Sequence, residues 1–226
     1  MISLKSWPEN ERPRERLMLH GPEALSDAEL IAVILRSGCK GQDAVAMSRS
    51  LLEQFGGLRG LGSTGGAELK KIKGLGAAKI ASLIAMSEIA RRQLRESAKN
   101  KNVVRDPESL VIYLKRAMQD LPVEVFKVLF VNKANALIGD WDLSRGTVDE
   151  AAVHPREILK KALELHATGV ILVHNHPSGR TEPSPEDAQI TRKIKNVCEA
   201  VSIRVLDHLI IGGDGYFSFR EQGMLE

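Results

Sequence analysis

Two histidines and an aspartate between positions 174 and 187 are spaced as metal ligands would be. His174 and His176 follow a wholly apolar run at 169–173, and Asp187 comes eleven residues after His176. Side chains at i and i+2 of an extended chain share a face, so both imidazoles can reach one ion. Two nitrogens and one carboxylate leave the fourth position of a tetrahedral Zn²⁺ open to water, as a hydrolytic site requires. We therefore expect these three residues to hold zinc, which lowers the pKa of water and polarises a carbonyl.

The same segment also has simpler interpretations. Ser184 followed by Pro185, with Asp187 three residues on, is a typical start of a helix, and capping alone would account for both polar residues. A His-Asn-His sequence also occurs in HNH nucleases, but those need further distant ligands in a ββα frame. The combination of a histidine pair at the end of a buried strand, a Gly/Pro-rich loop and a following acid favours the metal site.

The second half of the chain predicts alternating helices and strands. Its hydrophobic periodicity favours helices at 107–121, 155–167 and 187–201, and strands at 125–131, 136–143, 169–173, 203–211 and 216–219. The order α-β-β-α-β-α-β-β predicts a mixed sheet packed by helices. The short apolar run at 169–173 would be a buried strand, with His174 just beyond its end.

The first half of the chain reads as helical. Ser26 with Glu29 three residues later is a capping box before an apolar run, which predicts a helix at 25–35. Further helices are expected at 45–55, 67–73 and 77–96, with a glycine-rich loop at 60–66. One buried face of the long helix would comprise Ile80, Leu83, Ile84, Ser87 and Leu94. The polar stretch 97–105 is the expected boundary between domains at 1–97 and 104–226.

A second motif of interest lies in this helical half. Residues 69–80 resemble a helix-hairpin-helix, in which Gly74 and Gly76 let the backbone approach a phosphate and the next helix offers free N–H groups. Lys73 and Lys79 add positive charge, and residues 68–101 carry nine basic and three acidic side chains. We expect these four residues to bind DNA without sequence preference. The alternative is a turn used only for packing or protein contacts.

Composition sets broader bounds. The 226 residues are 43% hydrophobic and 27% charged, with a net charge of +3, as in ordinary globular proteins. No apolar run is long enough to span a membrane, and the polar start lacks the apolar stretch of a signal peptide. We expect a cytoplasmic protein that does not bind membranes. Cys39 and Cys198 form no CxxC pattern, so neither a disulfide framework nor a cysteine zinc site is expected.

Several strings together resemble a known family. His-x-His-Pro followed by Ser184 and Asp187 is similar to the JAMM motif of MPN+ metalloproteases. The longer string at 174–187, with Thr191 and the Asp207-His208 pair downstream, resembles the RadC family of bacteria, as do the segments at 12–17 and 24–30. The resemblance covers nearly the whole chain. It implies an α/β fold, with an N-terminal helix-hairpin-helix module and a C-terminal mixed-sheet MPN/JAMM domain that is cytidine-deaminase-like.

The resemblance also implies roles for residues. It implies zinc on His174, His176 and Asp187, and a part for Ser184 in stabilising the oxyanion. JAMM enzymes take their general base from a glutamate at the start of an earlier strand, which fits Glu124; Glu150 and Glu157 are rivals. His208 is expected to support the ligands through hydrogen bonds and not to be a ligand itself.

The implied activity is zinc-dependent hydrolysis of a peptide or isopeptide bond. Two alternatives stay open at this point: a non-enzymatic DNA repair or recombination factor with a structural zinc, and a metal-dependent nuclease. A fourth protein ligand would close the site and favour the structural role.

Overall fold

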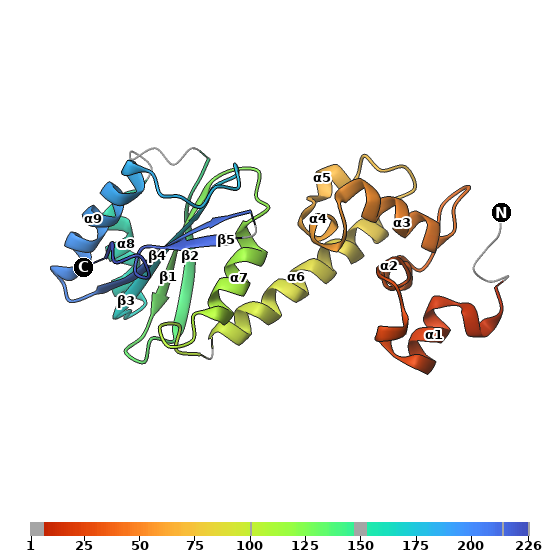
Figure 1. Ribbon diagram of the computed structural model, residues 1–226, viewed down its shortest axis with the longest axis horizontal. Helices are drawn as coiled ribbons and strands as arrows, with labels where there is room; N and C mark the ends of the chain where they lie inside the picture. Colours follow the sequence, from red (N-terminus) through yellow and green to blue (C-terminus); the bar gives the residue numbers. More distant parts are fainter. Residues whose placement is uncertain (1–6, 100, 147–152, 214, 226) are drawn as a thin grey trace. The chain divides into compact units, whose positions relative to one another are not determined.

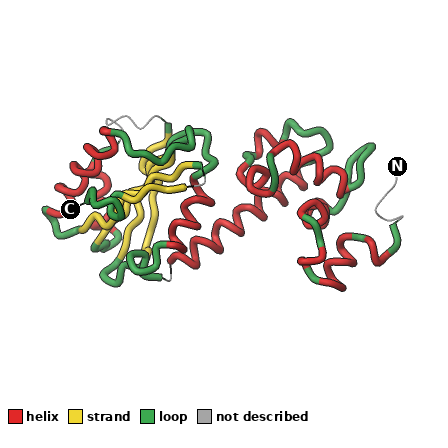
Figure 2. Tube along the Cα trace, viewed as in Figure 1, coloured by secondary structure: helices red, strands yellow, loops and turns green. Residues whose placement is uncertain are grey.

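The computed structural model describes residues 7–99, 101–146, 153–213 and 215–225. The chain forms two compact units, Met1–Ala90 and Arg91–Glu226, and the two meet within one long helix. The described part of the first unit is helical, whereas every strand of the sheet belongs to the second (Figures 1 and 2). This division agrees with the helical and mixed-sheet halves expected from the sequence.

The first unit consists of short helices followed by the long one. Its elements are η2 (Glu9–Glu11), α1 (Pro13–His20), η3 (Pro22–Ala24), α2 (Asp27–Leu35), α3 (Ala44–Phe55), α4 (Leu58–Ser63), α5 (Gly66–Leu69) and the start of α6 (Ala77–Lys99). Ser26 and Glu29 form the capping box that begins α2, and Gly56 ends α3 in the left-handed conformation. The start of α2 follows the capping box predicted from the sequence, and a glycine at the end of α3 is typical of this left-handed conformation.

Two expectations for this unit were wrong. Residues 60–66 are not a continuous glycine-rich loop, because α4 occupies Leu58–Ser63. Gly60 permits this close packing: a Cβ there would lie 1.7 Å from the carbonyl oxygen of Phe55. Ile84 of α6 is 43% exposed, whereas Ile80 and Leu83 are buried. The buried face of this part of the helix is therefore narrower than its spacing suggested.

The two compact units divide within α6, between Ala90 and Arg91. Ala98 is fully buried in the core of the second unit, and Leu94 packs against the same core. The last turns of α6 thus bury apolar surface together with α7, which assigns them to that unit. The polarity of the sequence does not show where the units divide, because α6 runs without a break through this point.

The second unit is a five-stranded mixed sheet with helices on both faces. Its elements are α7 (Glu108–Met118), β1 (Val125–Val131), β2 (Leu137–Arg145), α8 (Pro155–Glu164), β3 (Gly169–Asn175), α9 (Pro185–Glu199), β4 (Arg204–Gly212) and β5 (Gly215–Ser218). The strand order is β2-β1-β3-β4-β5, in which only the β3–β4 pair is parallel. The order of elements is the one predicted.

The two faces of the sheet have separate cores. Helix α7 lies on one face of the sheet, and α8 and α9 lie on the other (Figure 1). The core on the α7 face includes Val125, Leu129 and Val173, and the core on the other face includes Phe126, Val128 and Leu172. Every residue of β1 and β3 is buried, as expected of central strands that are covered on both sides. No helix in the described ranges is long and apolar enough to cross a membrane.

Candidate metal site

Strand β3 delivers the first two candidate ligands. It extends two residues beyond the predicted apolar run, so His174 and Asn175 are its last residues, and His176 follows directly. The backbone N–H of His176 donates to the carbonyl of Ile211 at 2.9 Å, which ties the start of the loop to β4. The Nε2 atoms of His174 and His176 lie 3.0 Å apart. The two imidazoles therefore converge, as their spacing predicted.

The far nitrogen of each imidazole has a partner. Nδ1 of His176 lies 3.1 Å from the carbonyl oxygen of Arg180, which can only accept, so Nδ1 carries the proton. Nδ1 of His174 lies 2.9 Å from Nε2 of His208, a buried residue of β4. His208 thus contacts the side of His174 that faces away from His176 and Asp187. Hydrogen bonds of this kind orient ligating histidines.

The loop after His176 is held close to the sheet. Gly179 adopts a positive φ of 81° and its N–H donates to the carbonyl of His176 at 2.9 Å. A Cβ at Gly212 would lie 2.5 Å from the carbonyl oxygen of Arg180. Only glycine fits at this point of β4, and its absence of a side chain lets the loop bring the Arg180 carbonyl to His176.

Helix α9 supplies the third candidate ligand from its first turn. Ser184 caps the helix: its hydroxyl accepts from the N–H of Asp187 at 3.1 Å and donates to Asp187 Oδ2 at 2.7 Å. Asp187 Oδ2 also accepts from the Ser184 N–H, completing a capping box. The other oxygen, Oδ1, lies 3.2 Å from Nε2 of His174. The capping interpretation and the ligand interpretation are therefore compatible, since each uses a different oxygen.

The three side chains fit a small tetrahedral cation. Ligands about 2.0–2.1 Å from a tetrahedral zinc lie roughly 3.3 Å from one another. The two Nε2 atoms are 3.0 Å apart; Asp187 Oδ1 lies 3.2 Å from His174 Nε2, and Asp187 Oδ2, which also accepts from Ser184, lies 3.8 Å from His176 Nε2. Because Nδ1 of His176 faces the Arg180 carbonyl, its Nε2 is the nitrogen available to a cation beside His174 and Asp187. A cation placed between the two Nε2 atoms and the Asp187 carboxylate would accept electron pairs from all three groups.

The electrostatics of the site favour a charged Asp187 carboxylate and an uncharged His208. Burial raises the pKa of Asp187, but hydrogen bonding and charge from His174, with the hydrogen bonds from Ser184, outweigh it and hold the pKa well below its usual range. Burial, and then the neighbouring His174, lower the pKa of His208. The His208 ring stacks on Phe219 at 4.8 Å and the His174 ring on Phe126 at 6.0 Å. The apolar surroundings of His208 favour its neutral form.

Glu124 lies beside the histidine pair. It immediately precedes β1, and one carboxylate oxygen is within 4.8 Å of ligand nitrogens of both His174 and His176. Among the described residues this is the glutamate that the fold brings to the candidate site. Glu157, its rival, lies in the first turn of α8 and pairs with Arg156, whereas Glu150 lies outside the described residues.

Asn175 positions the segment that carries Glu124. The sequence analysis did not identify this role of Asn175. The Asn175 side chain is fully buried: its Oδ1 accepts from the N–H of Val125 at 2.9 Å, and its Nδ2 donates to the carbonyl of Val123 at 3.2 Å. It therefore brackets Glu124 on both sides. A polar residue between two histidines at the end of an apolar strand was the available signal, because a buried amide needs partners.

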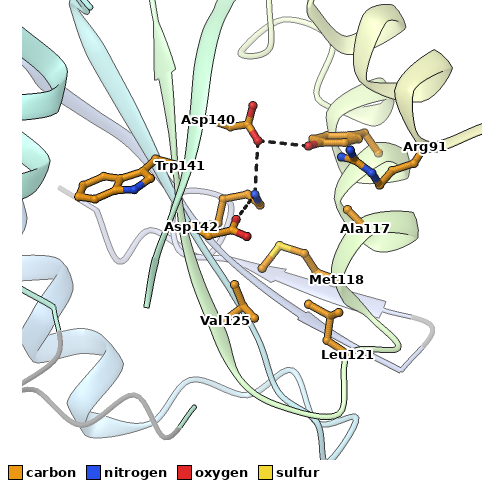
Figure 3. A pocket seen from close by; sticks show the side chains of 10 residues that line it. Arg91, Ala117, Met118, Leu121, Val125, Asp140, Trp141 and Asp142 are labelled. Carbon is orange, nitrogen blue, oxygen red and sulfur yellow. Dashed lines mark hydrogen bonds and ion pairs between the residues drawn. The ribbon is translucent and has the colours of Figure 1, made fainter. Parts of the chain in front are cut away.

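A separate cavity of about 510 Å³ lies on the opposite face of the sheet (Figure 3). Its floor includes Met118, Leu121 and Val125. Its charged wall is paired internally, since Lys127 forms ion pairs with Asp140 and Asp142, and Tyr113 donates to Asp140 at 3.5 Å. Burial, and then the charge of Asp140, raise the pKa of Tyr113. Because β1 alternates its side chains, Lys127 faces away from the side that carries Phe126 and His174.

The glycine turn of the first unit is tightly packed. Gly74 has a positive φ of 92°, and a Cβ there would lie 2.5 Å from the Cβ of Cys39. The Lys79 ammonium donates to the carbonyls of Gly38 at 2.7 Å and Gly74 at 3.3 Å. Lys73 and Gly76 are exposed. Lys79 therefore stabilises the turn in this structure. Of the four residues expected to bind DNA, only Lys73 and Gly76 are exposed and take no part in these packing contacts.

Fold and site together define a class of protein: a mixed-sheet domain of the JAB type with a candidate metal site, preceded by a helical unit. Family models agree, with a RadC-like JAB domain matching residues 104–224 and a UPF0758 N-terminal model matching residues 4–81. The chain belongs to the UPF0758 family, whose C-terminal part is a RadC-like JAB domain.

Relatives of similar length support this membership. A UPF0758 protein of Nitrosococcus oceani is 46% identical over 99% of this chain and 100% of its own. A UPF0758 protein of Aromatoleum aromaticum is 47% identical, again over 99% of this chain and 100% of its own. One from Methylibium petroleiphilum is 45% identical over 98% of this chain and 100% of its own. The resemblance inferred from the sequence motifs is thereby confirmed.

Proposed function

We propose that this chain is a zinc-dependent hydrolase of amide bonds, of the peptidase or isopeptidase kind, with a helical unit that binds DNA. The observation that carries the catalytic part is the convergence of His174 Nε2, His176 Nε2 and Asp187 Oδ1, with neighbouring atoms 3.0 and 3.2 Å apart. The donor set of two imidazoles and one carboxylate is typical of hydrolytic zinc sites. When bound, zinc supplies a Lewis acid that polarises the substrate carbonyl and lowers the pKa of water.

The other residues of the site suit hydrolysis. Glu124, within 4.8 Å of the ligand nitrogens, takes a proton from the attacking water and later delivers it to the leaving amine. Asn175 keeps Glu124 in place through its bonds to Val123 and Val125. Ser184 orients Asp187; donation to the developing oxyanion requires its hydroxyl to rotate away from Asp187 Oδ2.

A structural zinc site in a non-enzymatic factor is the second candidate. The observation that favours it is the same 4.8 Å approach, since Glu124 as a fourth ligand would close the coordination shell. His208 does not suit that role, because its Nε2 faces Nδ1 of His174. The hydrolase and the structural site differ in the role of Glu124. If Glu124 is a general base, its replacement leaves the zinc affinity unchanged; if it is a ligand, its replacement lowers the zinc affinity.

Zinc content provides the first test. We expect about one zinc per chain in the purified protein and a loss of at least tenfold in affinity for His174→Ala. Elemental analysis and competition with a chelator measure both. His154→Ala is the matched control, since His154 is an exposed residue at the start of α8. Equal zinc in the wild type and in His174→Ala would contradict the proposed site.

Hydrolysis is tested with defined probes. The zinc-loaded protein is incubated with a peptide pool and with peptides joined through a lysine isopeptide bond, and products are identified by mass spectrometry. Cleavage that disappears in both His174→Ala and Glu124→Gln supports the hydrolase. Cleavage that persists in both variants at the wild-type rate would come from a contaminant and would contradict the assignment.

A further inference from the structure

Behind His174, a chain of hydrogen bonds connects two of the candidate ligands. Thr191, one turn after Asp187 in α9, has its hydroxyl 2.5 Å from the carbonyl oxygen of Asp187 and 2.6 Å from Nδ1 of His208. His208 Nε2 in turn lies 2.9 Å from Nδ1 of His174. Thr191, His174 and His208 are all buried. The chain therefore runs from the backbone of one ligand to the ring of another, away from solvent.

The direction of each bond follows from the acceptor at its end. The Asp187 carbonyl can only accept, so the Thr191 hydroxyl donates to it and its oxygen is left to accept from His208 Nδ1. A neutral His208 then has an unprotonated Nε2, which accepts from Nδ1–H of His174. His208 is fully buried and in contact with the rings of Phe126 and Phe219, where an imidazolium is costly.

We propose that His208 and Thr191 are positioning residues that keep a proton on Nδ1 of His174, which leaves its Nε2 for the metal, and so set the metal affinity of the site. The affinity part rests on the zinc site proposed above, whereas the tautomer part concerns the metal-free protein. His174 Nε2 is the atom that lies 3.0 Å from His176 and 3.2 Å from Asp187. A proton on that nitrogen would exclude a cation from all three groups.

Removal of the Thr191 hydroxyl provides the most selective variant. Thr191→Val keeps the side-chain shape but leaves His208 Nδ1–H without its acceptor. The His208 ring then favours the other tautomer, with its proton on Nε2, which can donate only to an unprotonated Nδ1 of His174. That exchange moves the His174 proton to Nε2. We expect zinc affinity to fall about 10–100-fold, the usual effect of losing a partner of a ligating histidine.

Two further variants separate this effect from packing. Thr191→Ser retains the hydroxyl and should bind zinc as the wild type does. Thr168→Val makes the same chemical change at the other end of β3, where the hydroxyl is buried with no hydrogen-bond partner among the described residues. It should not alter zinc affinity. His208→Gln is a milder change than His208→Ala, because its amide can accept from His174 and donate to Thr191.

The experiment uses the full chain with two measurements. Zinc dissociation constants come from competition with a chelator at fixed pH, and the tautomer of His174 comes from ¹⁵N NMR of histidine side chains in the metal-free protein. We expect Nδ1–H in the wild type and in Thr191→Ser, and a shift toward Nε2–H with weaker zinc binding in Thr191→Val. Zinc binding by Thr191→Val within twofold of the wild type would overturn the inference, as would equal losses in Thr191→Val and Thr168→Val.

Failure of the proposed function gives a different result. If the wild type binds no zinc, the hydrolase proposal and the affinity part of this inference both fail. The NMR measurement still decides the tautomer: Nδ1–H on His174 that depends on Thr191 supports the positioning role, and Nε2–H in the wild type overturns it.

Discussion

At the residue scale, the carboxylate of Asp187 serves two purposes at once. Oδ2 accepts hydrogen bonds from the hydroxyl and N–H of Ser184, while Oδ1 faces Nε2 of His174. Because the cap already orients the Asp187 side chain, that side chain loses less conformational entropy when an ion binds. A residue whose sequence context indicates a helix cap is thus also available as a ligand.

Glu124→Gln should retain zinc and lose hydrolysis. The amide has the shape of the carboxylate but cannot take a proton from water, and a general base contributes about 10²–10⁴-fold. Turnover of any cleaved probe and zinc affinity are measured on the same preparation. Glu157→Gln is the matched control, because Glu157 lies in α8 beside Arg156. A large loss of zinc in Glu124→Gln would instead identify Glu124 as a ligand and favour the structural site.

The thiol of Cys198 should make stability fall at alkaline pH. Burial, and then Glu199, raise the pKa of this thiol from 9.0 to about 11. A raised folded-state pKa means that the contribution to stability is complete below about pH 9 and is lost as the pH rises through about 11. Between pH 8 and 10.5 the wild type should lose up to about 2 kcal/mol more of its unfolding free energy than Cys198→Ala. Denaturant titrations at both pH values measure the difference, and parallel losses would contradict the prediction.

At the scale of elements, the site lies where the end of β3 meets the start of α9. Strand β3 is fixed by β1 and β4 on its two sides, and α9 packs on one face of the sheet through Ile190 and Ile194. The ligands therefore come from two elements that the core already holds in place. Such placement on rigid elements reduces the entropy lost when an ion binds.

The capping box of α9 can be tested against its twin in α2. Ser184→Ala and Ser26→Ala each remove a cap that bonds to the third residue of its helix, so each should cost about 1 kcal/mol of stability. Only Ser184→Ala should also weaken zinc binding, by roughly tenfold, because only that serine orients a ligand. Thermal unfolding and chelator competition measure the two effects. Equal zinc affinity in both variants would show that the cap does not orient the ligand.

At the scale of the whole molecule, the chain combines a mixed-sheet domain with a helical unit, and basic side chains cluster toward the end of that unit and just beyond it. Residues 68–101 carry six more basic than acidic side chains, although the whole chain has a net charge of only +3. Four of the nine basic side chains in this range, Lys70, Lys71, Lys73 and Lys79, lie in the first unit and support the proposal that it binds a phosphate backbone. Lys79 is engaged with the carbonyls of Gly38 and Gly74, so Lys70 and Lys73, both exposed, are better choices for a test.

The full chain should bind duplex DNA weakly, without sequence preference and less tightly as salt rises. Each neutralised phosphate contributes about −0.9 to the slope of log affinity against log salt, so Lys70→Glu with Lys73→Glu should reduce the slope by about 2. Titrations of two unrelated labelled duplexes at several salt concentrations measure this. Zinc content should not change.

A charge-matched control uses Lys133→Glu with Lys160→Glu, two exposed positions in the mixed-sheet domain. This pair should affect DNA binding little if contacts are confined to the helical unit. No binding at low salt would contradict the DNA part of the proposed function, while the zinc and hydrolysis tests would be unaffected.

The sequence by itself determined the order of elements, the class of the C-terminal domain and the three candidate ligands. These features depend on local patterns: the apolar run before His174, the spacing to His176, and the Ser184 cap before Asp187. The strand and helix periods act over a few residues and so can be read directly. The identity of β1 as Val125–Val131 followed from such a pattern without adjustment.

The sequence indicated His208 as a residue that supports the candidate ligands, but only the tertiary structure showed which atoms it and Asn175 contact. Asn175 brackets Glu124 across the β1–β3 pair, and His208 reaches His174 from β4, 34 residues later in the chain. The domain boundary within α6 was decided in the same way, because Ala98 is buried by contacts with the second unit's core. These contacts depend on strand register and on packing between elements far apart in sequence, which local patterns do not determine.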